Sequence, residues 1–229
     1  MKNLCSFAFG LALAMAPTAV AQAQPSPANS DVYHVHFTKA LPGEALALGE
    51  FLKKPDPQSP MPEHFIVLRH QQGDDWDYVV IEHLGAKATI DPAGTPPNAG
   101  RDLRAWHADT FVSGPSWGEF TRAMGIGQAA GTTGGSVYSV AVWRAAAGHR
   151  DQLEKTLRTP TSPAQAPGKS VVLAHLEGGP WTFLALDRYD SWEAFAKDQA
   201  ATAAGDGWAS IRQHSTYHHD TVADRIAPK

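Results

Sequence analysis

Two closely spaced histidines are the residues of this sequence best suited to chemistry. His34 and His36 are two positions apart, so in an extended strand their side chains share one face. Two imidazoles on one face suit a metal ion, or a general base that works with a partner. Glu82 could complete a set of two histidines and one carboxylate. The plainer alternative is a polar strand face at a sheet edge or interface.

A second group of candidate ligands lies near the C-terminus. It consists of His214, His218, His219 and Asp220. His214 and His218 are four positions apart and would share a face if they lie on a helix. This group predicts a metal site as the runner-up to the first pair. The same region carries a His-x-Asp-Thr pattern, which also occurs at His107–Thr110, and its presence twice favours a structural role.

The composition excludes several classes of protein. The formal net charge is −4, and removal of Lys2 with an N-terminal signal would make it −5, so nothing indicates nucleic-acid binding. The single cysteine, Cys5, lies in that signal, which leaves the mature chain without a thiol nucleophile or a thiolate ligand. There is no Walker loop, nucleophile elbow, His-Glu-x-x-His motif or dinucleotide-binding glycine motif.

The elements that position these residues follow from hydrophobic periodicity. Alternation predicts strands, proline and glycine mark the turns, and Ser191 is the expected N-cap of a helix. The predicted strands cover 31–38, 64–70, 76–83, 136–143, 169–176, 181–188 and 221–226, with helices at about 46–52, 148–158, from 191 onward and at 206–217. The order is β-α-β-β-α-β, written twice.

The second half of the chain repeats the first at a spacing of 105 residues. Val32-Tyr33-His34-Val35 aligns with Val137-Tyr138-Ser139-Val140, and Val67–His70 with Val172–His175. Trp76 aligns with Trp181, and the alignment needs no gap over 32–82. Matches of rare residues such as tyrosine, histidine and tryptophan indicate a tandem duplication. Residues kept in both copies are then structural candidates, and those found in one copy, chiefly His34 and His36, are functional candidates.

Two tandem ferredoxin-like units with aromatic-rich strands resemble the dimeric α+β barrel superfamily. Its members include antibiotic-biosynthesis-type monooxygenases and heme-degrading monooxygenases. The resemblance covers most of the mature chain and concerns the fold, because this superfamily hosts many chemistries. It implies an α+β fold in which the two units pack sheet to sheet as an intramolecular barrel, with heme or a divalent metal as cofactors to consider.

The strand alternation predicts which side chains line the space between the two sheets. Tyr33, Val35 and Phe37 are assigned to the helix side, so His34 and His36 would face inward. The same rule places Trp76, Tyr78 and Glu82 inward, together with Trp181 and Phe183 of the second copy. Aromatic walls with a few polar groups are typical of a ligand pocket. We therefore expect His34, His36 and Glu82 to be catalytic and the four aromatic residues to bind the ligand.

The N-terminal residues predict an exported protein. Lys2, an apolar run and small residues predict a signal peptide over 1–23, cleaved after Ala21 or Ala23. Residues 24–30 read as a disordered mature N-terminus. The first unit is then 31–124, the glycine-rich linker 125–135 and the second unit 136–229.

The sequence supports three functional hypotheses. The first is a periplasmic or secreted, small-molecule-binding barrel with monooxygenase-like or heme-linked chemistry. The second is a non-catalytic periplasmic binding or stress protein, and the third is a metal-binding protein that uses the C-terminal histidines. We expect a small-molecule ligand, no nucleic-acid partner and no membrane association after signal cleavage. A barrel completed within one chain predicts a monomer or a weak dimer.

Overall fold

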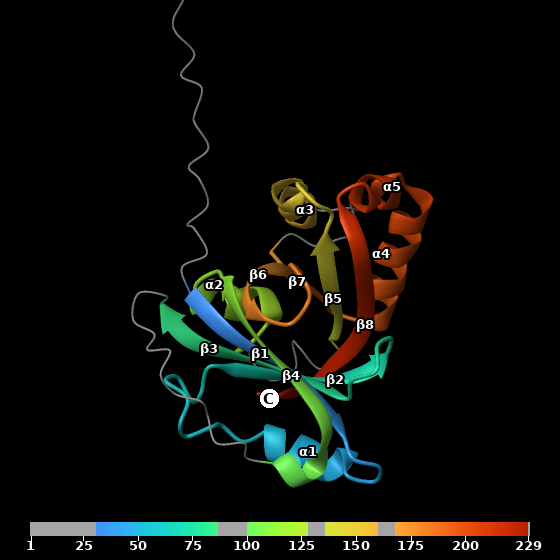
Figure 1. The fold of residues 1–229 in the computed structure, drawn as a ribbon. Coiled ribbons are helices and arrows are strands. Elements are labelled where there is room, and N and C mark those ends of the chain that lie inside the picture. Colours follow the sequence, from blue (N-terminus) through green and yellow to red (C-terminus); the bar gives the residue numbers. More distant parts are fainter. Residues whose placement is uncertain (1–30, 87–99, 128–135, 160–167, 229) are drawn as a thin grey trace, which may run out of the picture.

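The structure is a computed structural model that describes residues 31–86, 100–127, 136–159 and 168–228. The expected signal, the expected mature N-terminus and most of the expected linker lie outside these residues. Eight antiparallel strands of the described chain form one closed barrel in the order β1-β3-β2-β8-β5-β7-β6-β4 (Figure 1). The fold is therefore α+β with a single antiparallel sheet.

Each half of the chain contributes four neighbouring strands to the barrel. The first half contains β1 (Asp31–Ala40), α1 (Ala45–Leu52), β2 (Phe65–Gln72), β3 (Tyr78–Ala86), the 3-10 helix η2 (Arg101–Leu103), β4 (Arg104–Gly114) and α2 (Trp117–Met124). The second contains β5 (Val137–Ala145), α3 (Arg150–Leu157), β6 (Ser170–Gly178), β7 (Phe183–Tyr189), α4 (Trp192–Ala204), α5 (Gly207–Arg212) and β8 (Ser215–Ala227). The pairs β2–β8 and β4–β6 join the halves, so hydrogen bonds as well as side-chain packing close the barrel.

Large apolar side chains from both halves fill the barrel interior. Tyr33, Val35 and Phe37 of β1 belong to one buried cluster with Tyr138 and Val140 of β5. Strands β2, β3, β6 and β7 add aliphatic residues to the same cluster. The interior is thus the main hydrophobic core, and its burial is the largest apolar contribution to stability.

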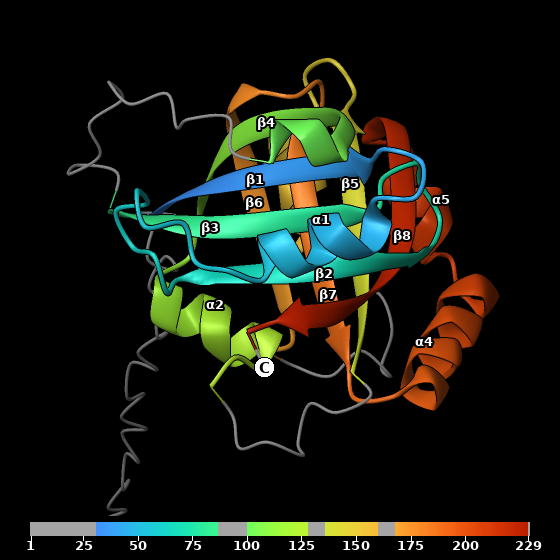
Figure 2. The same ribbon diagram turned by 90° about the horizontal axis from the view of Figure 1, so that it is seen from below.

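Helices cover parts of the outer face of the barrel. Helix α1 packs Leu48 and Leu52 on Val67 and Val80, and Figure 2 shows it lying across β3 and β2. On the second half, α3 and α5 cover the outer face with Leu153 and Ile211, which pack around Trp143 and Phe183. No helix among the described residues is long and apolar enough to cross a membrane.

Helix α2 follows β4 and closes one opening of the barrel. Its residues Phe120, Ala123 and Met124 are buried in the interior cluster rather than on the outer face. Ser116 begins the helix with a capping box, in which its side chain and that of Glu119 satisfy each other's backbone N–H groups. A helix packed against the interior must lie at an end of the barrel, because strands surround the rest.

The structure corrects the predicted elements at two places, and a third falls partly outside the described residues. Between β3 and β4 the described residues contain only η2, and 87–99 are not described; the helix α2 follows β4. The helix predicted at 206–217 ends at Arg212, and the last strand is longer than 221–226 because it begins at Ser215. Ser191 is confirmed as an N-cap, since its hydroxyl accepts the Ala194 N–H at 3.1 Å.

Candidate functional site

The predicted orientation of the strand faces is wrong. Tyr33, Val35 and Phe37, assigned to the helix side, fill the barrel interior, so His34 and His36 lie on its outer face. Alternation along a strand separates two sets of side chains but does not say which set turns inward. In a closed barrel the interior takes the larger apolar set, because that buries the most surface.

The outer face of the first half nevertheless brings His34 and Glu82 together. Strand β3 pairs with β1 so that Glu82 is directly opposite His34, and β4 flanks β1 on the other side. The His34 Nδ1 lies 3.0 Å from a carboxylate oxygen of Glu82, and its Nε2 lies 2.9 Å from one of Asp109. An imidazole that donates from both nitrogens carries a positive charge. His34 is therefore an imidazolium held between two carboxylates.

The electrostatics of His34 agree with this geometry. Burial alone would lower the pKa of His34, but the hydrogen bonds to Asp109 and Glu82 outweigh it and raise the pKa to about 9. The His34 side chain is mostly buried, whereas that of Asp109 is 44% exposed. The cation thus lies just beneath the surface, with a solvent-facing carboxylate on one side.

His36 is the neutral partner of this cation. Its side chain is buried, only 7% exposed, and its Nε2 has no hydrogen-bond partner. Burial, with the charge of Arg104 next in importance, lowers the pKa of His36 to about 3. The ring of His107 meets it edge-on, with centroids 5.3 Å apart. A nitrogen with so low a pKa is a weak proton acceptor at neutral pH, so His36 contributes a neutral imidazole beside the His34 cation.

Two further residues extend the site. Arg104 begins β4, and its buried Nε has no hydrogen-bond partner; burial lowers the pKa of its guanidinium. Phe111 stacks on His34 with ring centroids 5.2 Å apart and is 40% exposed. The outer-face site is defined here as His34, His36, Glu82, Arg104, Asp109 and Phe111. It combines a cation, a neutral imidazole, an unpaired donor and an exposed flat ring.

The site does not fit a metal held by two histidines and a carboxylate. Both ring nitrogens of His34 are occupied by carboxylates, whereas a ligating imidazole must offer a deprotonated nitrogen. Within the part of the chain that the structure describes, no group of three or more His, Cys, Asp or Glu side chains could hold a metal ion. His34 likewise cannot serve as the ligand of a heme iron.

The aromatic residues predicted to bind a ligand are not gathered at this site. Trp76 and Trp181 are buried in the barrel interior, edge-on to His70 and His175. Tyr78 lies under α1 and its hydroxyl donates to the Ala45 carbonyl at 2.6 Å. Phe183 is buried in the cluster beneath α3 and α5. The predicted pocket is therefore divided among three packing regions.

The C-terminal histidines do not form a common site, because each contacts a different neighbour. His214 lies between α5 and β8 and contacts His149, with 2.9 Å between the two Nδ1 atoms. His218 stacks on Trp143, while His219 lies 3.7 Å from Asp74. The helix face expected to join His214 and His218 does not exist, because α5 ends before His214 and β8 carries His218.

The repeated His-x-Asp-Thr pattern fastens the hairpins of the two halves to each other. The Thr110 hydroxyl accepts the Gly179 N–H at 3.0 Å, and the Thr221 hydroxyl accepts the Asp74 N–H at 3.2 Å. Each threonine therefore binds a turn of the opposite half. These bonds support the structural role that the repetition indicates.

Sequence reasoning missed Asp109, Arg104 and Phe111 as site residues. Asp109 belongs to the repeated pattern, and this assigned it a structural role. The sequence alone does not identify them. His34 lies opposite Phe111, and His36 opposite Asp109, only because β4 pairs with β1 in this register, and neither the partner strand nor the register can be read from the sequence.

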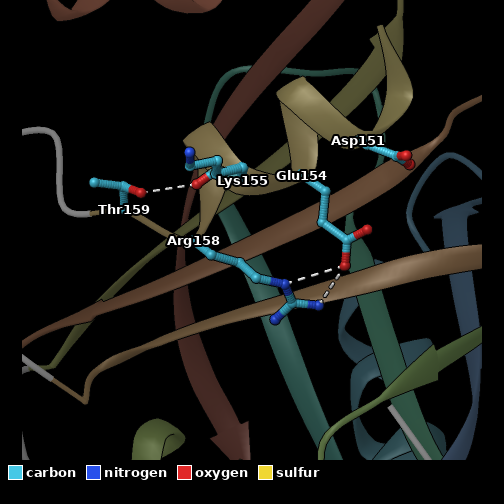
Figure 3. Close-up of a pocket in the computed structure, with 5 residues that line it drawn as sticks. All are labelled: Asp151, Glu154, Lys155, Arg158 and Thr159. Atoms are coloured by element: carbon cyan, nitrogen blue, oxygen red, sulfur yellow. Dashed lines mark hydrogen bonds and ion pairs between the residues drawn. The ribbon is translucent and has the colours of Figure 1, made fainter. Parts of the chain in front are cut away.

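A surface hollow of about 420 Å³ lies beside α3, away from the outer-face site (Figure 3). Its lining is Asp151, Glu154, Lys155, Arg158 and Thr159. The Arg158 guanidinium already binds the Glu154 carboxylate at 2.8 Å, as Figure 3 shows. Exposed pairs of this kind are common on helix surfaces and indicate no chemistry.

Comparisons with known proteins bear on the fold. No protein-family model matches the chain, and no curated protein matches its sequence. An anthrone oxidase-like protein of known structure superposes with a TM-score of 0.50 and 12% identity, over 86% of this chain and 92% of that one. A "putative monooxygenase" from Lactobacillus acidophilus NCFM superposes with a TM-score of 0.50 and 8% identity, over 86% and 94%. The chain shares an α+β fold with these two proteins.

Proposed function

We propose that this protein is an enzyme that binds a flat aromatic small molecule as its anion at the outer-face site and directs that anion to dioxygen. The observation that carries the proposal is the His34 cation, which lies between Glu82 and Asp109 and stacks on the exposed ring of Phe111. A fixed positive charge beside an aromatic ring stabilises the anion that forms when a bound substrate loses an acidic C–H or O–H proton.

Each residue of the site has a distinct role in this proposal. His36 stays neutral, and the proton of the substrate leaves to solvent water. His34 stabilises the negative charge that develops on the substrate, and its two carboxylates keep it protonated. Arg104 adds a second positive charge to this face, and that charge favours an anionic substrate. Phe111 supplies an exposed ring on which an aromatic substrate stacks.

An anthrone is a suitable test substrate, since one structural neighbour is named for an anthrone oxidase-like activity. The methylene carbon loses a proton to water, and the resulting carbanion, stabilised by the His34 cation, is oxidised by dioxygen. One oxygen atom becomes the new carbonyl and the other leaves as water, which takes up the two methylene hydrogens. Anthrone and one O2 thus give anthraquinone and one water, so atoms and electrons balance.

Oxygen uptake with 1,8-dihydroxyanthrone as the probe tests the proposal. We expect uptake above the spontaneous rate for the purified protein, and a loss of about 100-fold or more in His34→Gln, the range for removal of one electrostatic stabiliser of a developing anion. His218→Gln is the matched control, because His218 stands at the position of His107 in the second half and should leave the rate unchanged. An active His34→Gln variant, or no uptake by the folded parent, would overturn the proposal.

We also infer that the protein is exported and that its two halves arose by duplication. The charge, apolar run and small-residue sites of residues 1–23 support export. The duplication is supported by equal strand orders, β4-β1-β3-β2 and β8-β5-β7-β6, and by similar edge-on pairs His70–Trp76 and His175–Trp181. N-terminal sequencing of the exported protein should begin at Gln22 or Gln24, and light scattering should report one chain per particle or a weak dimer.

A further inference from the structure

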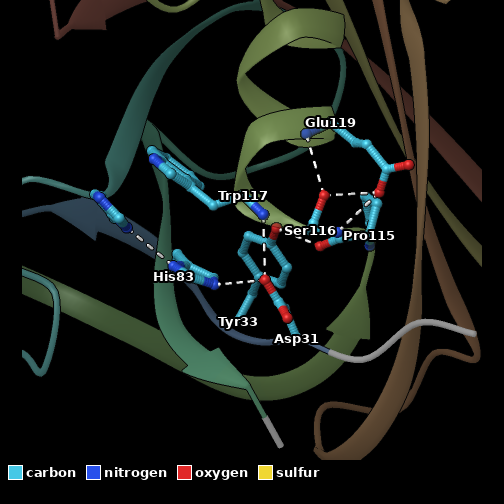
Figure 4. A network of polar contacts seen from close by, with 8 residues as sticks. Asp31, Tyr33, His83, Pro115, Ser116, Trp117 and Glu119 are labelled. Atoms are coloured by element: carbon cyan, nitrogen blue, oxygen red, sulfur yellow. Dashed lines mark hydrogen bonds and ion pairs between the residues drawn. The ribbon is translucent and has the colours of Figure 1, made fainter. Parts of the chain in front are cut away.

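Three side chains linked by polar contacts lie at the start of α2 and take no part in the outer-face site. Asp31 begins β1, His83 lies on β3 and His64 immediately precedes β2. The His83 Nε2 lies 2.9 Å from an Asp31 carboxylate oxygen, and the His83 Nδ1 lies 3.0 Å from the Nδ1 of His64. Figure 4 shows Asp31, His83 and Trp117 gathered at the first turn of α2.

The first residue of helix α2, Trp117, binds this group of three side chains. The backbone N–H of Trp117 donates to the same carboxylate oxygen of Asp31 at 3.1 Å. The Trp117 indole stacks on His64 at 4.7 Å and 13°, and on His83 at 5.4 Å and 15°. Phe120, one turn along, stacks on the indole at 5.4 Å. The two imidazoles are therefore part of the surface that holds the helix end.

The contact between the two Nδ1 atoms limits how many protons the histidines can hold. At 3.0 Å one nitrogen must donate and the other must accept, so at least one of the two rings is neutral. If both rings are protonated, each ring carries a positive charge and the two Nδ1–H groups point at each other. The contact must then open, and the stack on Trp117 opens with it. Burial and the charge of His83 both lower the pKa of His64, in agreement with this limit.

The other charged groups around α2 do not change over the same pH range. The Arg188 Nε donates to the Ala123 carbonyl at 3.1 Å, and Arg225 donates to the Gly125 carbonyl at 3.0 Å, so two guanidiniums hold the C-terminal end. Near the N-terminal end, Glu119 is held in the capping box and the Tyr33 hydroxyl donates to the Pro115 carbonyl. Glutamate, tyrosine and arginine ordinarily titrate well outside pH 5–7.

We propose that His64, His83 and Asp31 form an acid-sensitive latch that holds α2 over the barrel opening. A second proton on the histidine pair releases the N-terminal end of the helix, while the arginines retain its C-terminal end. The opening then gives access to the interior cluster that Phe120 and Met124 cover. The latch belongs to the first half alone, because the residues 105 positions later are Ser136, Lys169 and Arg188.

Hydrogen exchange of the α2 backbone between pH 5 and pH 8 tests the latch. After correction for the intrinsic pH dependence of exchange, we expect protection of residues 117–124 to fall at least tenfold below about pH 6, as local opening exposes the amides. His64→Gln cannot take the second proton, so its α2 protection should be independent of pH. His149→Gln is the matched control: it removes another Nδ1–Nδ1 histidine pair, the one with His214, and should behave as the parent.

A second measurement makes the test independent of variant folding. Histidine NMR titration of the parent protein should show the second protonation of the His64–His83 pair at the same pH as the loss of α2 protection. Protection that does not depend on pH in the parent would overturn the latch. It would also be overturned if His64→Gln kept the parent's pH dependence, or if the two midpoints were well separated.

Discussion

Replacement of Asp109 by asparagine removes one of the two carboxylates that keep His34 protonated. The pKa of His34 is raised from its ordinary 6.5 to about 9. A group whose pKa is raised on folding stabilises the folded state fully below its unfolded pKa, and this contribution is lost as the pH rises through the folded pKa. The stabilisation from His34 is therefore complete below about pH 6.5 and disappears above about pH 9.

The size of the effect follows from the shift and from the exposure of the partner. A rise from 6.5 to about 9 corresponds to about 3 kcal/mol in total, at about 1.36 kcal/mol per pKa unit. Asp109 and Glu82 share this contribution, and the Asp109 side chain is 44% exposed, so solvent screens its part. We expect Asp109→Asn to lower the free energy of unfolding by about 1 kcal/mol at pH 7, and by less at pH 10.

Urea unfolding at several pH values between 6.5 and 10 measures this effect, and histidine NMR gives the pKa of His34 directly. Asp220→Asn is the matched control, because Asp220 stands at the position of Asp109 in the second half and does not contact His34. The control should keep the parent's loss of stability between pH 7 and pH 10. If Asp109→Asn also keeps the whole of that loss, His34 is not the group that titrates and the reasoning fails.

Two further predictions concern the contacts that join the halves of the barrel. Thr110→Ala leaves the Gly179 N–H without its partner and should lower the free energy of unfolding by about 1–2 kcal/mol in a urea titration. Thr221→Ala should have a similar cost at the opposite turn, and a double variant no less stable than either single one would contradict this account. Gly178→Ala should cost about 2–3 kcal/mol, since φ is +110° and the new Cβ would lie 2.3 Å from the Asp109 carbonyl oxygen. Gly127→Ala, with φ of +74° and no neighbour within 4 Å, should cost distinctly less in the same assay, and equal costs would show that the close approach does not matter.

The sequence predicted the local elements well because local rules determine them. Alternation in β1 and in β5 located the strands within two residues of their observed ends. The predicted N-cap at Ser191 is confirmed, since its hydroxyl accepts the backbone N–H of Ala194, three residues along the chain. The predicted α+β class agrees with the structure and with its neighbours.

The site was predicted only in part. His34 and Glu82 do meet, because β1 and β3 of the same half are neighbouring antiparallel strands whose register places them opposite each other. Asp109 and Arg104 were missed because β4 reaches β1 only through the tertiary arrangement. The latch residues His64 and His83 were missed for a related reason: their partner Trp117 belongs to a helix that leaves the sheet and closes the barrel end.

For this protein, the sequence by itself determined where most of the strands lie and which side chains share a face of each strand. A period of two residues gives that grouping without reference to the rest of the chain. Only the tertiary structure decided which face is interior. Closure through β2–β8 and β4–β6 turns Tyr33, Val35 and Phe37 inward and leaves His34 and His36 on the outer face. Burial of the larger apolar set is a property of the whole barrel, so no single strand could reveal it.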